Sequence, residues 1–440
     1  MPIAGLKTCR RLSSATSAEK NISFRVSHQC PQCGAPIVLD EDTLFFVCEY
    51  CRVKSCICRQ GFPRYMFSRS PPARAHPEAP DDEDLVYIPY WRFKGVRYTC
   101  GPQGVTHKFL DISAIALEQF SSHLPFSLGF RSQALPLKQI TPETRGRFFR
   151  PADANTILGR TKHLRSRIQE KPVSGFTEDI GETCSLIYSP FYEKDGVLVD
   201  AILNRPSGSV LESDRTLQSL QVCRPEKQTL FVPGLCPACG WDLEGSRDSL
   251  VLVCRNCHSL WKARNSQLAR VRFACARPGR DTDVMVPFWK ISTRISTFSL
   301  SSYADLVRLG NLPRSLQPEW ENQALFFWAP AFKIRPRIFL RLAAQLTASQ
   351  PDPVLEQKIG THIHVPVTLP ATEAVQSIRV LLAGLSKPLK DHLPALSQMQ
   401  IEPVHAMLVY LAFEEQHHDY VHPGTQAAIN KNVLALSSNL

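Results

Sequence analysis

The chain has 440 residues, with 51 Lys and Arg against 40 Asp and Glu, and a formal net charge of +11. No run of about 18 or more apolar residues occurs, which argues against a membrane-spanning helix. The 34 prolines and the broken apolar periodicities argue against a helical bundle or a doubly wound sheet, and predict a strand-rich α+β fold.

The cysteine count and the N-terminal residues bear on the compartment. Fifteen cysteines are an odd number, and without an apolar signal segment the chain does not have the pattern of a disulfide-built secreted protein. We therefore expect a reducing, cytoplasmic environment and no membrane partner. Residues 1–25 are predicted to be a disordered basic tail, with an organelle transit peptide as the alternative. The charged residues that support both interpretations are Lys7, Arg10, Arg11, Lys20, Arg25 and a single acid, Glu19.

Residues 26–60 contain four cysteines with metal-ligand spacing. Cys30 and Cys33 form one Cys-x-x-Cys pair, and fourteen residues separate it from a second pair, Cys48 and Cys51. Two thiolates separated by two residues converge on one cation, and a short hairpin brings the second pair over to complete a tetrahedral sulfur cage. The same pattern recurs in residues 231–264, at Cys236, Cys239, Cys254 and Cys257.

Each pattern, Cys-Pro-x-Cys-Gly followed by Cys-x-x-Cys, resembles that of the zinc-ribbon superfamily. The resemblance covers about 22 residues in each copy. It implies two structural Zn²⁺ ions, because four thiolates leave no open position on the metal, and each ion would contribute on the order of 10 kcal/mol to folding. Two alternatives stay open. They are thiols without metal, reduced or disulfide-bonded, and an iron-sulfur cluster on Cys48, Cys51, Cys56 and Cys58.

Residues 61–84 follow the first ribbon and are predicted to be a flexible tether rich in Pro and Arg, because few large apolar residues follow Phe67. Body domain 1 is predicted at 85–205. Within it, residues 86–98 are β-branched and aromatic, which predicts a strand, whereas residues 112–120 have apolar residues near helical spacing.

Residues 131–171 are strongly basic, with ten Lys and Arg against three acids. We expect this stretch to be able to track phosphates, with Phe148 and Phe149 available to stack on bases. The competing interpretation is an ordinary solvated surface, because many basic proteins bind no nucleic acid specifically.

A linker at 206–230 leads to ribbon 2 at 231–264 and to body domain 2 at 265–440. We predict a short second tether near 277–283. The composition predicts strands at 284–300 and 324–334, and helices at 339–346 and 372–385. An acid-free stretch precedes the body and contains Lys262, Arg264, Arg270, Arg272, Arg277 and Arg280.

The order of these features predicts a tandem duplication of a unit of about 200 residues. The segment Val86–Trp91, with Pro89 and two aromatic residues, corresponds to Val284–Trp289. Near the end of each half, residues 186–191 correspond to residues 408–413. A weaker match relates residues 126–137 to residues 331–343.

One further constellation has metal-binding side chains. His362 and His364 would share one face of a strand, and a second group follows near the C-terminus. The favoured interpretation is an ordinary surface, because the corresponding residues 191–199 of the first half contain no histidine. The second group comprises Glu414, Glu415, His417, His418, Asp419 and His422.

The sequence contains no Gly-rich phosphate loop, no GxSxG elbow and no HExxH motif. We therefore expect no catalytic residues, and a non-enzymatic interaction or scaffold protein that contacts a protein partner through two zinc ribbons. The alternative is a transcription-associated nucleic-acid-binding protein that contacts phosphates through its basic flanks.

Overall fold

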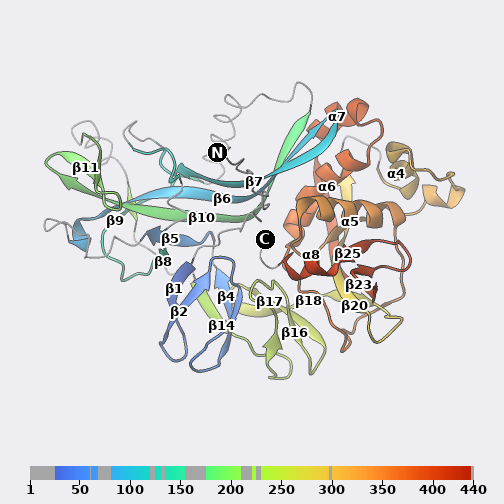
Figure 1. The fold of residues 1–440 in the computed structure, drawn as a ribbon, viewed down its shortest axis with the longest axis horizontal. Coiled ribbons are helices and arrows are strands. Elements are labelled where there is room, and N and C mark those ends of the chain that lie inside the picture. Colours follow the sequence, from blue (N-terminus) through green and yellow to red (C-terminus); the bar gives the residue numbers. More distant parts are fainter. Residues whose placement is uncertain are drawn as a thin grey trace, which may run out of the picture.

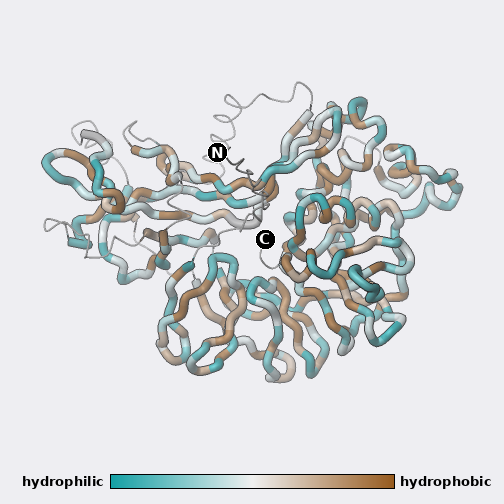
Figure 2. Tube along the Cα trace, viewed as in Figure 1, coloured by the Kyte–Doolittle hydropathy of each residue, from teal (hydrophilic) through white to brown (hydrophobic). Residues whose placement is uncertain are grey.

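The architecture is a strand-rich α+β fold, as predicted. Figure 1 shows the two four-cysteine ribbons next to each other beneath the long strands of the first half. The helices of the second half lie on the right of the view. Apolar and hydrophilic stretches alternate along the strands of both ribbons and of the long sheet (Figure 2). The computed structural model describes residues 25–59, 61–67, 81–118, 124–129, 135–153, 175–209, 221–223, 229–296 and 300–437.

An 11-stranded sheet organises the first half, in the order β13-β9-β6-β10-β5-β8-β1-β2, with β7 on β6 and with β11 and β12 beyond β10. Its two faces are covered by separate apolar clusters. The strands are β1 (Arg25–Gln29), β2 (Pro36–Asp40), β5 (Arg64–Phe67), β6 (Val86–Gly101), β7 (Gly104–Ile115), β8 (Leu137–Gln139), β9 (Arg147–Phe149), β10 (Phe176–Lys194), β11 (Val197–Asp200), β12 (Arg205–Ser209) and β13 (Val222–Cys223).

Two small sheets form the ribbons. The first has the order β14-β4-β3 and the second the order β15-β16-β17-β18. Their strands are β3 (Phe45–Val47), β4 (Lys54–Arg59), β14 (Thr229–Pro233), β15 (Leu243–Glu244), β16 (Leu252–Cys254), β17 (Ser259–Arg264) and β18 (Gln267–Val271).

A 7-stranded sheet in the order β21-β20-β23-β19-β22, extended by β24 and β25, organises the second half. The predicted strands and helices of this half are found, the helices within α5 and α6. The elements are β19 (Phe273–Ala276), β20 (Val284–Ile295), α4 (Tyr303–Gly310), β21 (Phe327–Pro330), α5 (Pro336–Ser349), β22 (Leu355–Glu356), α6 (Ala371–Leu385), α7 (Leu389–Gln398), β23 (Ile401–Glu415), β24 (Asp419–Val421), β25 (Ala428–Asn430) and α8 (Lys431–Ala435).

The central strand pairs of the two sheets have matching registers. In β6 and β10, Trp91 lies opposite Leu186. In β20 and β23, Trp289 lies opposite Leu408. A parallel strand joins each pair at the same place, β5 on β10 and β19 on β23.

A β-bulge also falls at corresponding places in the two strand pairs. The register of β10 against β6 shifts between Gly181 and Thr183, and that of β20 against β23 shifts between Ser292 and Thr293. A bulge bends a strand and raises its local twist. Both long strand pairs are therefore bent at the same distance from their tryptophan.

The predicted helix at residues 112–120 is wrong. Residues 112–115 instead continue β7, which pairs with β6 over its whole length. The reason is a two-residue period: Ile115 and Leu117 belong to the apolar cluster on one face of the sheet, while Ala114 and Ala116 belong to the cluster on the other.

The predicted connections differ from the structure in two places. Residues 64–67 of the predicted tether form β5 between β10 and β8, because Tyr65 and Phe67 are buried in the sheet core. The predicted linker 206–230 contains most of β12, all of β13 and the start of β14. Residues 68–80 of the tether, residues 210–220 and 224–228 of the linker, and residues 1–24 of the tail lie outside the described residues.

The long strands of the first half also pack against the second half. Tyr98 and Ile180 belong to the same apolar cluster as Ile378 and Leu381 of α6. Glu178 of β10 forms an ion pair with Arg379 of α6. The two halves therefore share one apolar cluster, in addition to the contact between the ribbons.

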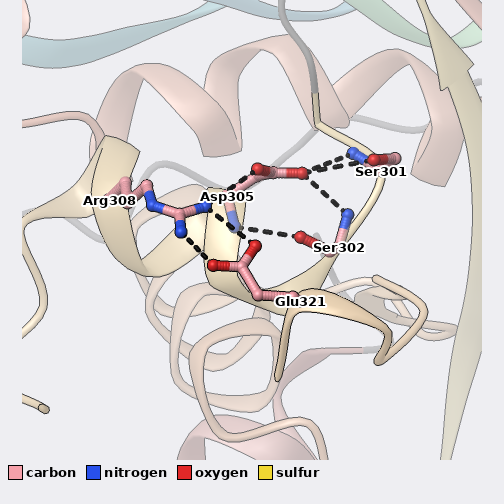
Figure 3. Close-up of polar contacts among 5 residues, drawn as sticks. All are labelled: Ser301, Ser302, Asp305, Arg308 and Glu321. Atoms are coloured by element: carbon pink, nitrogen blue, oxygen red, sulfur yellow. Dashed lines mark hydrogen bonds and ion pairs between the residues drawn. The ribbon is translucent and has the colours of Figure 1, made fainter. Parts of the chain in front are cut away.

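Helix α4 begins with a capping box (Figure 3). The Asp305 backbone N–H donates to the Ser302 hydroxyl, and the Asp305 carboxylate accepts the Ser302 N–H at 2.9 Å and the Ser301 N–H at 3.0 Å. Arg308 connects Asp305 to Glu321. Partial burial raises the pKa of Asp305. Hydrogen bonds from the N–H groups of Ser302 and Ser301 lower this pKa by more, so it lies below its usual range.

We expect Asp305→Ala to loosen the first turn of α4. Losing this cap costs about 1 kcal/mol, which speeds hydrogen exchange of the α4 amides about fivefold at neutral pH. The folded pKa of Asp305 is depressed, so its contribution is present above the unfolded value of about 3.9 and is lost as the pH falls through the folded pKa. Exchange rates of the two proteins should therefore converge in acid. A difference that persists there would contradict a role for the carboxylate charge.

Candidate metal centres

Two groups of four cysteines are each placed to hold one metal ion. In both, the four Sγ atoms lie within 4.8 Å of one another. In ribbon 1 the Cys30 and Cys51 sulfurs are 3.7 Å apart and the Cys33 and Cys48 sulfurs 3.9 Å. The corresponding distances in ribbon 2 are 3.6 Å for Cys236 with Cys257 and 3.4 Å for Cys239 with Cys254.

These distances fit a tetrahedral sulfur cage and exclude disulfides. A tetrahedron with Zn–S bonds of about 2.3 Å has sulfur atoms about 3.8 Å apart, whereas a disulfide requires about 2.05 Å. All eight cysteines are unbridged, and in each Cys-x-x-Cys pair the first thiol is buried and the second exposed. Disulfide pairing of these positions, one of the open alternatives, is therefore not what the chain adopts.

Tight turns bring the two thiols of each first pair together. Gly34 and Gly240 follow these pairs with φ of +72° and +73°, a left-handed conformation that favours glycine. The Gly34 N–H donates to the Cys30 carbonyl at 2.9 Å, and the Gly240 N–H to the Cys236 carbonyl at 2.8 Å. The Cys-Pro-x-Cys-Gly sequence thus closes its own turn.

The thiols of one cage have opposite pKa shifts. The backbone N–H of Cys33 lowers the pKa of Cys30 to about 6. In ribbon 2 the Asn256 side chain lowers the pKa of Cys239 to about 6, while burial and then the neighbouring thiols raise the pKa of Cys254 to about 12. Four thiolates ionise together only when a cation compensates their charge, which is the condition that a soft divalent metal supplies.

Ribbon 2 has a hydrogen-bonded support that the sequence analysis missed. The Ser259 hydroxyl lies 2.9 Å from Cys257 Sγ and accepts a hydrogen bond of 2.7 Å from the indole N–H of buried Trp261. Ribbon 1 has Val53 at the position of Ser259, two residues after its last ligand. The sequence signal that could have revealed this support is Ser259 itself, which lies two residues after the predicted ligand Cys257.

We expect Ser259→Ala to weaken metal binding directly at ribbon 2. Groups that orient a ligand contribute about 10- to 100-fold to metal affinity, so zinc release to a chromogenic chelator should begin with one fast equivalent. Val53→Ala is the control, because Val53 occupies the corresponding position of ribbon 1 and has no hydroxyl. Two equivalents released together at the wild-type rate would contradict this role.

The two ribbons share a strand. Strand β14 leads into Cys236 through two residues, and β1 leads directly into Cys30. Yet β14 pairs antiparallel with β4 of ribbon 1, from Thr229 opposite Arg59 to Pro233 opposite Ser55. In ribbon 2 the corresponding place beside β17 is taken by β18. The first strand of ribbon 2 therefore completes the sheet of ribbon 1.

Side chains add to this junction. Phe45 and Cys56 of ribbon 1 form one buried cluster with Leu252 and Trp261 of ribbon 2. The Lys54 ammonium lies 3.2 Å from the Asp242 carboxylate. Arg247 forms ion pairs with two ribbon 1 acids, Asp40 and Asp42. The ribbons are therefore packed together and do not move on separate tethers.

A buried ion cluster, also missed from the sequence, fixes ribbon 1 to the first body. Arg92 Nη1 donates to Glu41 Oε2 at 2.7 Å, and Arg92 Nε and Nη2 donate to the two Asp111 oxygens, each at 2.7 Å. The Arg92 side chain is 1% exposed and that of Glu41 4%. Glu41 and Arg92 are 51 residues apart in the sequence, so no local sequence pattern indicates that they pair.

The iron-sulfur alternative lacks its geometry. Cys56 and Cys58 lie on β4, and neither belongs to the group formed by Cys48, Cys51 and the first pair. Cys56 packs in the junction between the ribbons, where burial raises its pKa to about 12. Cys58 accepts the Ser266 N–H at 3.2 Å.

The histidines and carboxylates of the disfavoured metal-site alternative do not assemble. Over the described residues, which include all of its members, three or more ligand atoms converge only in the two cysteine groups. His364 Nδ1 lies 3.2 Å from Arg255 Nη2, and burial and this guanidinium lower the pKa of His364. The buried His422 is bound to Thr425. Glu415 pairs with Lys431.

The predicted stacking residues are unavailable. Phe148 and Phe149 are 1% and 3% exposed, and the Phe148 ring stacks on Tyr87 with centroids 4.4 Å apart. The expectation that they stack on bases is wrong, because they form the core of the first sheet. Six of the ten cations of the predicted basic stretch lie outside the described residues: Arg131, Arg160, Lys162, Arg165, Arg167 and Lys171.

Comparison of the chain with protein-family models, with curated proteins and with solved structures gives no match. Within the described part of the chain, no helix has the length and apolar character needed to cross a membrane.

Proposed function

We propose that the chain binds two structural Zn²⁺ ions and acts as a non-enzymatic docking module for a protein partner. The observation that carries the proposal is the pair of four-thiol cages. Four soft ligands in a tetrahedral arrangement favour zinc and leave it without an open coordination position. The ions would hold the shape of the ribbons and take no part in turnover.

Exposed apolar side chains at the junction support a docking role. Leu235 and Trp241 of ribbon 2 are 49% and 57% exposed, and Val47 of ribbon 1 is 45% exposed. Lys54 relates the three positions. Val47 is its partner in β3, Gly234, the residue before Leu235, donates to its carbonyl, and Asp242, the residue after Trp241, pairs with its ammonium. Grouped apolar side chains on a surface are typical of protein contact sites.

Affinity purification from the native cell tests the docking role. We expect the wild-type chain to recover a partner that the variant Leu235→Ser with Trp241→Ala does not recover. The variant should also fail to bind that partner when the two purified proteins are mixed. Val354→Ser with Leu316→Ser is the matched control, because these exposed side chains, at 77% and 47%, belong to the second half outside the ribbons. A partner retained by the ribbon variant would contradict the assignment of this surface.

We also propose that the two halves are copies of one unit. The equal tryptophan registers, the bulges at corresponding places and the parallel third strands support this inference. A further support is the hydrogen bond from Ala116 to the Pro89 carbonyl, which matches that from Ala331 to the Pro287 carbonyl. This match makes Ala331 the counterpart of Ala116 in the other half. The weaker sequence match of 331–343 to 126–137 is therefore displaced by about ten residues.

The unbridged cysteines support a reducing compartment, and we propose the cytoplasm. None of the 14 described cysteines forms a disulfide, which is typical of proteins kept in contact with cellular thiol reductants.

A further inference from the structure

A groove in ribbon 1 lies between strands β2 and β3. Its volume is about 310 Å³, and its lining includes Val38 and Leu39 of β2, Phe45 and Val47 of β3, and Arg247 of ribbon 2. Val38 and Val47 are 61% and 45% exposed. Among the described strands, β2 and β3 do not pair with each other. The two strands of one hairpin therefore border an open, mainly apolar groove.

Strand β2 has an unpaired backbone edge. Among the described strands it pairs only with β1. Hydrogen-bonded and non-hydrogen-bonded pairs alternate along an antiparallel ladder, and the Cys30 N–H donates to the Ala35 carbonyl at 2.8 Å. Val38, which lies opposite Ser27, therefore belongs to a non-hydrogen-bonded pair. Its N–H and C=O point away from β1.

Strand β3 has an edge of the same kind, since it pairs only with β4 in the described part of the chain. The Cys48 N–H donates to the Val53 carbonyl at 3.0 Å, so the preceding residue, Val47, points its N–H and C=O away from β4. The Phe45 N–H points the same way and donates to the Arg247 carbonyl at 3.0 Å. A backbone carbonyl from outside the hairpin thus already bonds to this edge, next to the groups of Val47.

Ribbon 2 has a strand at the corresponding place. Val253 is the counterpart of Val47, because each immediately precedes the second cysteine pair of its ribbon. Glu244 is the counterpart of Val38 in the cysteine spacing, and it lies opposite Val253 in the β15–β16 pair. In ribbon 1, β2 instead belongs to the 11-stranded sheet. The edge that ribbon 2 pairs with its own strand is therefore left uncovered by the described strands of ribbon 1.

We propose that an extended apolar segment of a partner protein inserts into this groove as a β-strand, with backbone hydrogen bonds to Val38 on one side and Val47 on the other. The inference rests on the proposed docking function and names the kind of segment that docks. Outward N–H and C=O groups on two strands require alternating donors and acceptors, which an extended backbone supplies. The exposed valines favour apolar side chains at every second position, because residues i and i+2 of a strand share one face.

Selection from a displayed library of random peptides of about 10 residues, the length of a long strand, tests the proposal on the full zinc-loaded chain. We expect the enriched peptides to have apolar residues at alternate positions. Val38→Pro should weaken binding of the best peptide about tenfold or more, because proline removes the outward N–H and leaves a peptide carbonyl without its donor. The β1 ladder does not use this N–H. Val38→Thr keeps it and is the matched control, with an expected change below about threefold.

N-methylated versions of the selected peptide give a second test that does not depend on how a variant folds. The amides of alternate residues point to opposite edges of a strand. Methylating either alternate set keeps every side chain, and each should weaken binding about tenfold or more, because an inserted segment bonds to β2 through one edge and to β3 through the other. This test decides the matter if Val38→Pro does not keep two zinc ions.

Three results would overturn the proposal: no enriched peptide, equal binding by zinc-loaded Val38→Pro and the wild-type chain, or undiminished binding after methylation of either set. A dimer of the chain alone that Val38→Pro dissociates would also overturn it, because a second copy would then occupy the groove. The docking proposal is tested separately by Leu235→Ser with Trp241→Ala. A partner that this variant loses and Val38→Pro retains would leave docking standing and remove only the inserted strand.

Discussion

Removing the metal from ribbon 1 is expected to weaken zinc binding at ribbon 2 by about 5- to 150-fold, the usual range for coupled sites. The variant is Cys33→Ser with Cys51→Ser, which changes the two exposed thiols of the cage. Without its ion the β3–β4 hairpin loosens, since Cys48 follows β3 and Cys51 precedes β4. Strand β14 then loses its partner, and β14 leads through Gly234 into Cys236. Zinc content should fall to one ion, and competition with a chelator measures the affinity of the remaining site.

Reciprocity supplies the control for this coupling. Cys239→Ser with Cys257→Ser should weaken ribbon 1 by the same factor, because the coupling free energy between two binding sites is symmetric. Cys184→Ser with Cys223→Ser, two partly buried thiols outside the cages, should leave both affinities unchanged. Independent ribbons, as a tethered arrangement predicts, would instead leave the surviving site at wild-type affinity.

Arg92→Met is expected to destabilise the attachment of ribbon 1 to the first body by about 3 to 5 kcal/mol, because it leaves the Glu41 carboxylate buried without a partner. The Arg92 side chain fills the space between β6 and ribbon 1 and is 1% exposed. Met retains most of the apolar volume, so the loss is electrostatic. Limited proteolysis of residues 25–59 and denaturant unfolding measure the effect.

Two further variants separate the buried charge from simple loss of packing. Arg145→Met removes an ion pair with Glu83 whose side chains are 71% and 70% exposed, and should cost under about 1 kcal/mol. Arg92→Met with Glu41→Leu and Asp111→Leu should recover much of the lost stability, because replacing a whole buried ion cluster by apolar side chains is often neutral. A triple variant as unstable as the single one would assign the effect to packing.

The features that could be predicted from the sequence are those set within a few residues. The cysteine spacing and the glycine after each first pair define the cages, because two knuckles and a hairpin suffice to build them. Helix α6 likewise follows from local periodicity, and strand β6 from its β-branched and aromatic composition. The buried apolar side chains of α6 belong to one core, and β6 is buried on both faces.

The features that escaped prediction depend on partners distant in the chain. Residues 64–67 have the composition of a tether, yet β10, more than 100 residues later, gives them a strand partner. Strand β14 is an ordinary short apolar run, and nothing local shows that it pairs with ribbon 1. Phe148 and Phe149 stand between arginines, which suggested exposure, but the first sheet buries them. Predicting these contacts requires knowing the topology first.

Metal analysis of the purified chain, combined with X-ray absorption at the zinc edge, tests the central claim most directly. We expect two zinc ions per chain, each with four sulfur neighbours at about 2.3 Å and no nitrogen or oxygen ligand. A chain that is folded without metal, that holds fewer than two ions, or whose zinc has a light-atom ligand would contradict two closed structural sites.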